Sequence, residues 1–134
     1  MKIFRYALFT IVTFVAGCYL IDSGIEWKGG PYQLGWIDDP KAVTLSFAGD
    51  SEHLLERIDS VVFAVGWNGR YLIAKQHPGG NREITNYFVI DSANDYAAAD
   101  PAQVVTGPLN EGEFQKMSSE LGLPKFSKKL DALE

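Results

Sequence analysis

The feature that most constrains the fold is the dipeptide Asn68-Gly69, which stands between two strand-like runs at residues 60–67 and 70–76. Both runs are rich in β-branched and aromatic residues. Asn-Gly between two such runs is the strongest short-range signal for a β-hairpin, because a type I′ turn needs positive φ at both central residues. The sequence therefore predicts an antiparallel hairpin with this dipeptide at the centre of its turn.

Three further runs, at residues 32–37, 43–47 and 83–91, have the alternation or the residue content of strands. Residues 51–59 fit either a short helix or the beginning of the next strand, and we favour a strand or an irregular entry to it. Residues 92–100 are expected to form one helical turn or a loop, and residues 103–106 a short edge strand that ends at Gly107-Pro108. This order predicts an antiparallel β-meander of about five strands.

A C-terminal helix is predicted to follow Asn110, which is a good N-cap residue, with two glutamates in the first turn. Phe114, Met117 and Leu121 are spaced i, i+3 and i+7, which gives the helix one apolar face. Gly122 predicts its end. The expected fold class is α+β, with this helix packed on one face of the meander and the last ten residues as a frayed turn or tail.

The N-terminus has the layout of a secretory signal peptide. Lys2 and Arg5 precede an apolar run, and small residues follow it. Cys18, the one cysteine of the chain, stands directly after Ala16-Gly17. Two other interpretations stay open: an uncleaved transmembrane helix over about residues 3–21, or a plain signal peptide followed by an ordinary thiol.

The run Val15-Ala16-Gly17-Cys18 resembles the lipobox of bacterial lipoproteins. The resemblance implies cleavage between Gly17 and Cys18, diacylglycerol on the Cys18 sulfur, and acylation (for example with palmitate) of the new amino terminus. It implies a cell-envelope protein held by its lipid, and Tyr19 favours the outer membrane, on its periplasmic side, in a Gram-negative cell. The expected organisation is a signal peptide at 1–17, a lipidated cysteine and tether at 18–31, and a single α+β domain at 32–134.

A second resemblance covers about half of the chain. The run V-x-x-V-G-W-N at residues 62–68 is followed by strand-like runs at 71–76 and 87–91 and by G-P-L-N-E-G-E-F at 107–114. Together these residues resemble a family of small uncharacterised bacterial lipoproteins and related exported domains. The resemblance implies the order strand, strand, strand, helix, and it assigns no active-site residue.

Charge and motifs exclude several classes of function. The net charge of −5 becomes about −7 once Lys2 and Arg5 are removed with the signal peptide. An acidic chain without a basic cluster argues against a nucleic-acid partner. No metal-ligand spacing, G-x-S-x-G motif or phosphate-binding loop is present in the sequence. We therefore expect no catalytic residue, no metal and no cofactor other than the covalent lipid on Cys18.

The candidate interface residues are Trp36, Trp67, Arg70 and Tyr71, because Trp, Tyr and Arg are enriched in interface hot spots. The alternative is structural: Trp67 and Tyr71 as a cross-strand pair that stabilises the hairpin, and Trp36 as a core residue.

These observations predict a membrane-tethered, non-catalytic binding module. Its partners would be the bilayer, through the acyl anchor, and an envelope protein or ligand, as for an inhibitor or immunity-type protein. A structural envelope lipoprotein without a soluble partner is one alternative. A small-ligand carrier or enzyme is another, and it would need a deep pocket lined by Trp36, Tyr87 and Phe88 with His77 or Arg70 converging on it.

Overall fold

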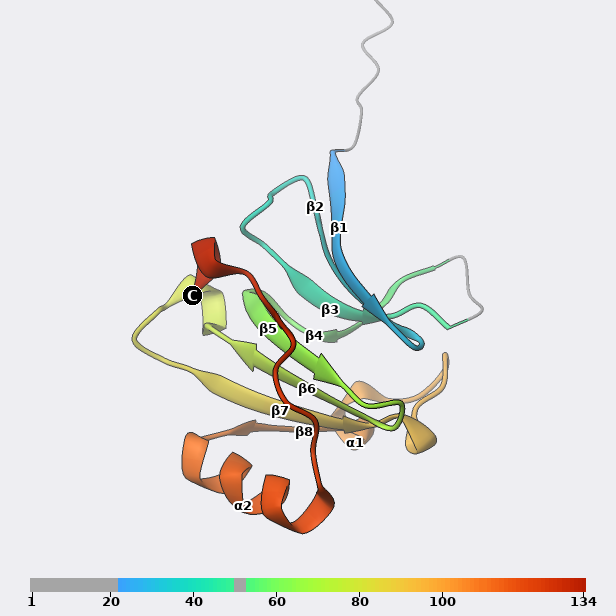
Figure 1. Ribbon diagram of the computed structural model, residues 1–134. Coiled ribbons are helices and arrows are strands. Elements are labelled where there is room, and N and C mark those ends of the chain that lie inside the picture. The colour runs from blue at the N-terminus through green and yellow to red at the C-terminus, as the bar shows by residue number, and fades with distance from the viewer. Residues whose placement is uncertain (1–21, 50–52) are drawn as a thin grey trace, which may run out of the picture.

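The computed structural model describes residues 22–49 and 53–134, so the predicted signal peptide, the lipobox and Cys18 lie outside the described residues. The strands form two antiparallel sheets (Figure 1). Sheet A has the order β1-β2-β3-β4, and sheet B has the order β8-β7-β6-β5-β9. The strands are β1 (Ser23–Gly29), β2 (Tyr32–Ile37), β3 (Thr44–Phe47), β4 (Leu55–Ile58), β5 (Val62–Trp67), β6 (Tyr71–Gln76), β7 (Asn86–Asp91), β8 (Val105–Leu109) and β9 (Lys128–Lys129).

The helical segments are short apart from one. They are η1 (Pro78–Gly80), η2 (Ser92–Asn94), α1 (Pro101–Val104), α2 (Glu111–Leu121) and η3 (Asp131–Leu133). No helix in the described part of the chain is long and apolar enough to cross a bilayer. The structure is mostly β with one longer helix, and the prediction of a single meander of about five strands is wrong in both the number of strands and the number of sheets.

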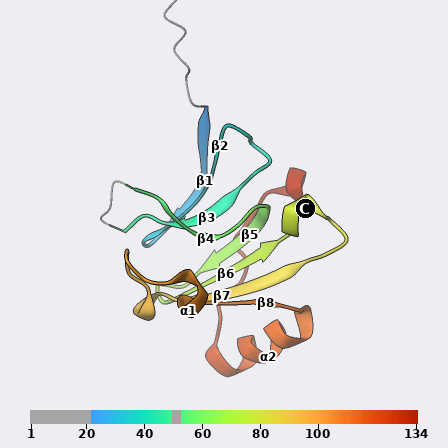
Figure 2. The same ribbon diagram turned by 180° about the vertical axis from the view of Figure 1, so that it is seen from behind.

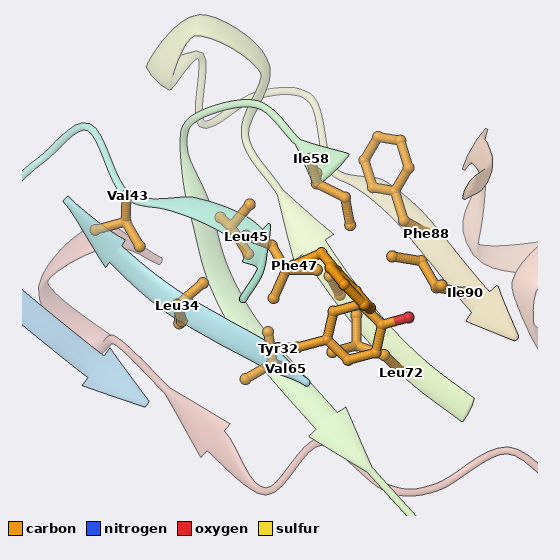
Figure 3. Packing of buried hydrophobic residues seen from close by; sticks show 12 residues of the cluster. Tyr32, Leu34, Val43, Leu45, Phe47, Ile58, Val65, Leu72, Phe88 and Ile90 are labelled. Atoms are coloured by element: carbon orange, nitrogen blue, oxygen red, sulfur yellow. The ribbon is translucent and has the colours of Figure 1, made fainter. Parts of the chain in front are cut away.

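The main core lies between the two sheets. The chain passes from sheet A to sheet B between β4 and β5, and the N–H of Val62 donates a hydrogen bond to the carbonyl of Val43 at 2.9 Å, which joins the sheets at this corner. Figure 3 shows how apolar side chains of the two sheets meet. Sheet A contributes Tyr32, Leu34, Val43, Leu45, Phe47 and Ile58, and sheet B contributes Val62, Val65, Leu72, Ala74, Phe88 and Ile90.

Sheet B is apolar on both faces because β6 and β7 each contain four consecutive hydrophobic residues, at 71–74 and 87–90. Alternate residues of a strand point to opposite faces. Phe88 therefore joins the core toward sheet A, whereas Tyr87 joins a second cluster on the other face. Phe114 of α2 belongs to this second cluster, and its ring stacks on that of Tyr87 with centroids 4.8 Å apart. Figure 2 shows α2 on the side of sheet B that faces away from sheet A.

The ends of α2 confirm the capping signals. The side chain of Asn110 accepts a hydrogen bond from the N–H of Glu113 at 2.8 Å, and the carboxylate of Glu113 accepts one from the N–H of Asn110 at 3.1 Å. This reciprocal pair satisfies two backbone donors that a helix start leaves free. Gly122 adopts the left-handed conformation (φ 62°) that ends many helices.

Both ends of the described chain belong to the sheets, contrary to the prediction. Residues 18–31 were expected to be a tether, but Ser23–Gly29 form β1, which pairs with β2 and places Trp27 against the core. The expected C-terminal tail forms β9, which pairs with β5, and Leu130 and Leu133 pack on the core. Pairing and burial at these two positions come from strands distant in sequence, so local composition did not predict them.

The strand expected at residues 103–106 is displaced. Asp100 caps a helical turn at Pro101–Val104 by accepting a hydrogen bond from the N–H of Ala102 at 3.0 Å. The strand β8 begins only at Val105 and continues through Gly107-Pro108, where the sequence predicted its end. Proline is tolerated there because β8 is at the edge of sheet B.

Candidate functional site

A cleft of about 680 Å³ lies at one end of the two sheets, and we call it the end cleft. Several loops converge on it: the β1–β2 turn, the segment after β3, the β5–β6 turn and the segment after β7. Figures 1 and 2 both show the two turns and the segment after β7 at the same end of the molecule. Its lining residues are Gly30, Pro31, Phe47, Gly49, Trp67, Gly69, Ser92, Asp95, Tyr96 and Ala97.

Aromatic rings form much of the wall of the end cleft. The ring of Trp67 meets that of Tyr32 edge to face at 5.5 Å, and Tyr32 meets Phe47 in the same way at 5.8 Å. Tyr96 is 60% exposed at the rim. Phe47 is buried and has the guanidinium of Arg57 over its ring, so the accessible aromatic surface comes from Trp67 and Tyr96. The end cleft therefore offers aromatic surface that a ligand can contact.

Two glycines make room for these rings. Gly30 has φ 53°, and a Cβ atom there would lie 2.5 Å from the indole of Trp67. Gly49 has φ 49°, and a Cβ atom there would lie 2.7 Å from the ring of Phe47. Any side chain at either position would both strain the backbone and displace an aromatic ring. The width of the end cleft therefore depends on glycine at these two positions.

A buried ion pair lies behind the wall of the end cleft, which Asp95 lines. The guanidinium of Arg57 in β4 donates to the carboxylate of Asp95 from Nη2 at 3.0 Å and from Nε at 3.1 Å. The side chains are 2% and 0% exposed, respectively. Arg57 also donates from Nη2 to the carbonyl of Tyr96 at 2.9 Å. The pair thus fixes the segment after β7, which supplies Asp95 and Tyr96, against sheet A.

Tyr32 completes this network, which we call the Arg57–Asp95–Tyr32 network. Its hydroxyl donates to Oδ2 of Asp95 at 2.9 Å. Burial, and then the hydrogen bond to Asp95, raise the pKa of Tyr32 far above its usual value. Tyr32 therefore stays protonated and keeps donating. Both carboxylate oxygens of Asp95 are engaged, so Asp95 acts as a structural anion rather than a free base.

The four predicted interface residues do not form one surface. Trp67 lines the end cleft, whereas Tyr71 packs in the cluster on the opposite face of sheet B. They are not a cross-strand pair, because Trp67 pairs with Leu72. Trp36 lies in β2, where its indole N–H donates to Glu26 at 3.2 Å, and it packs at the margin of the core.

Arg70 lies beside the end cleft, at the tip of the β5–β6 hairpin. It is exposed, its guanidinium donates to Asp91 at 3.1 and 3.3 Å, and it lies over the ring of Tyr71. The hydrogen bond from Arg70 holds the pKa of the Asp91 carboxyl below its usual value. Arg70 is therefore already paired within the hairpin.

The predicted hairpin is present, but its turn differs from the prediction by one residue. The side chain of Asn68 accepts hydrogen bonds from the N–H groups of Arg70 (3.0 Å) and Tyr71 (2.8 Å). Gly69 has φ 94°, and Arg70 is not among the residues with positive φ. A type I′ turn centred on Asn68-Gly69 is therefore wrong. The central residues are Gly69 and Arg70, and the glycine is first, as in a type II′ turn.

The pocket considered for a carrier or enzyme is not formed by the expected residues. Tyr87 and Phe88 point to opposite faces of sheet B. His77 is buried and stacks on Phe63 at 4.1 Å, and its Nδ1 donates to the carbonyl of Ile84 at 2.9 Å. Within residues 22–49 and 53–134, no three His, Cys, Asp or Glu side chains gather as metal ligands would.

The Arg57–Asp95–Tyr32 network was missed from the sequence. Its members are 38 and 63 residues apart, and no local motif connects them. A charged residue within the strand-like run before Ile58 was the one available signal, and the ambiguity of residues 51–59 concealed it. The network is a product of the two-sheet topology.

Comparison with known proteins identifies a family without a described activity. The sequence model of a family described as a protein of unknown function, DUF3997, matches residues 29–133. No curated protein and no solved structure matches the chain. The match begins at the last residue of β1, and it includes the other eight strands, α2 and every residue that lines the end cleft.

Proposed function

The chain belongs to the DUF3997 family of proteins of unknown function, and from that premise we propose that it is a non-catalytic binding module, tethered to the cell envelope by lipid on Cys18. The observation that supports this proposal is the aromatic end cleft. Its one carboxylate, Asp95, is neutralised by Arg57 and accepts hydrogen bonds on both oxygens. Such a cleft suits binding through aromatic surface better than it suits acid–base chemistry.

The position of the end cleft fits a tethered module. β1 has seven residues, so at about 3.3 Å per residue it spans roughly 20 Å. The chain enters β1 at Ser23, whereas Gly30, which follows β1, lines the end cleft. Figure 1 shows the chain entering at one end of β1 and the β1–β2 turn at the other. An anchor on Cys18 would therefore attach at the end of β1 opposite the end cleft, which leaves the end cleft open to an envelope partner.

The chemistry of the end cleft indicates the kind of partner. The residues that line it include three aromatic rings and no Lys or Arg. Aromatic faces attract cations and stack on flat apolar groups. The domain is acidic as well, which steers basic partners toward it. The proposed ligand is an exposed segment of an envelope protein that presents a basic or aromatic side chain.

Affinity measurements on matched variants test the proposal. Tyr96→Ala removes a largely exposed ring from the rim of the end cleft, and Leu121→Ala removes an exposed side chain from α2 as a control. For a partner captured on the full chain, Tyr96→Ala should weaken binding by about tenfold or more, as for an interface hot spot. Leu121→Ala should leave the affinity unchanged. Equal affinity of both variants and the parent chain would rule out the end cleft as the binding site.

The anchor has a separate test. Intact mass of the membrane-extracted protein should show loss of residues 1–17 and the mass of acyl chains on Cys18, and Cys18→Ser should abolish both. A full-length, unacylated mass would contradict the lipid tether. It would not bear on the end cleft, which the affinity measurements on Tyr96→Ala and Leu121→Ala test separately.

A further inference from the structure

A second hollow, of about 460 Å³, lies on the face of sheet A that points away from sheet B, and we call it the outer hollow. Three large hydrophobic side chains line it and are strongly exposed: Ile25 at 57%, Ile37 at 60% and Leu54 at 46%. Its other lining residues are Ser23, Gly24, Gln33, Gly35, Trp36, Thr44, Ser46 and Glu56. Clustered exposed hydrophobic side chains mark an interaction surface, whereas isolated ones do not.

The outer hollow lies where the chain enters the domain. Ser23 and Gly24, the first residues of β1, line it. Cys18 precedes Ser23 by five residues, which span at most about 18 Å when fully extended. The first described strand, β1, belongs to sheet A, and Figures 1 and 2 show α2 on the far side of sheet B from sheet A. A lipid on Cys18 would bring this face, and not the end cleft, against the bilayer.

The chemistry of the outer hollow fits a lipid surface. The hydrophobic side chains are surrounded by uncharged polar residues, Gln33, Thr44 and Ser46, and no basic residue lines the outer hollow. Glu56, its one ionisable lining group, has a pKa raised chiefly by burial and then by Asp59, so it loses charge more readily than an ordinary glutamate. Such a surface has little to attract anionic headgroups, and it suits a zwitterionic interface.

We propose that the outer hollow rests on the bilayer surface, with Ile25, Ile37 and Leu54 at the level of the lipid headgroups. The inference depends on the proposed lipid anchor, which holds this face at high effective concentration near the membrane. Three side chains alone would bind a bilayer weakly, and together with acyl chains they fix the orientation of the domain. The end cleft opens at the end of the sheets rather than on this face, so contact of this face with the bilayer leaves it accessible.

The test uses the full acylated chain in vesicles of zwitterionic phosphatidylcholine. A nitroxide label is attached to cysteine in Ile25→Cys, in Ile37→Cys and, as a control, in Leu121→Cys, which lies in α2. All three positions are exposed, so the label should not disturb the core. Collisions of each nitroxide with oxygen, which concentrates in lipid, are compared with collisions with a water-soluble nickel chelate. The parent chain, carried through the same labelling, shows whether the Cys18 thiol is free.

We expect the nitroxide to collide more often with oxygen than with the nickel chelate at positions 25 and 37, and more often with the chelate at position 121. Equal, water-like ratios at all three positions in vesicle-bound protein would overturn it while leaving the lipid anchor intact. Spin–spin broadening between labels at position 25 of different molecules, with low access to oxygen, would overturn it in favour of pairing between copies. Labelling of the parent chain at Cys18 would instead contradict the anchor, independently of the three collision ratios.

Discussion

Removing the carboxylate of Asp95 should destabilise the domain more than any surface change, because it leaves the Arg57 guanidinium buried without its anion. Arg57 is 2% exposed, and its remaining acceptors are the carbonyls of Tyr96 at 2.9 Å and Glu56 at 3.4 Å. Breaking a buried ion pair by deleting one partner costs about 3–5 kcal/mol. With a urea m-value of about 2 kcal/mol per molar, Asp95→Ala should lower the unfolding midpoint by about 2 M.

Two controls separate this cause from general damage. Asp91→Ala breaks the exposed pair with Arg70 and the hydrogen bond from the N–H of Ala93, and it should cost much less than Asp95→Ala. Arg57→Met combined with Asp95→Ala should be more stable than Asp95→Ala alone, because no unpaired charge is left in the core. Urea unfolding followed by tryptophan fluorescence measures all of them. A loss of under about 1 kcal/mol for Asp95→Ala, or strictly additive losses in the double variant, would refute the role given to the buried pair.

Three further predictions concern single residues. Because the pKa of Tyr32 is raised in the folded protein, its contribution to stability is complete below the ordinary tyrosine pKa of about 10 and is lost as the pH rises above that value. Tyr32→Phe should therefore make the loss of stability at alkaline pH shallower when unfolding is measured at stepwise pH. An unchanged slope would contradict this role of Tyr32. Gly69→Val should lower the melting temperature, because a β-branched residue tolerates φ 94° poorly although no atom lies within 4 Å; an unaltered melting curve would show that the turn is misplaced. Asn110→Ala should cost about 1 kcal/mol through loss of the α2 cap, measured by urea unfolding, and a neutral result would mean that the capping box contributes nothing.

Local signals predicted the parts of the fold that depend on neighbouring residues. The run at residues 32–37 coincides with β2, and Asn110 and Gly122 bound α2 as expected. Capping and alternation are decided within a few residues, so they can be read directly from sequence.

Features that depend on distant partners were not predictable in this way. Continuous apolar runs such as 87–91 fit a strand buried on both faces, but they do not show that a second sheet lies on one side and a helix on the other. The local composition of β1 is typical of a Gly-rich tether, because its strand conformation depends on pairing with β2. In the same way Trp67 was recognised as a candidate interface residue, while Asp95 and Tyr96 were not, because the loop that brings them to the end cleft is fixed by Arg57 from another sheet.

The most direct test of the account is photocrosslinking in the cells that produce the protein. A photoreactive amino acid replaces Tyr96 at the rim of the end cleft in one strain and Leu121 on α2 in another. We predict a discrete adduct with one envelope protein from position 96, which disappears when Gly30→Val displaces the Trp67 ring from the wall of the end cleft, and no such adduct from position 121. Identical adduct patterns from both positions, or no adduct from position 96, would contradict the claim that the end cleft binds a partner.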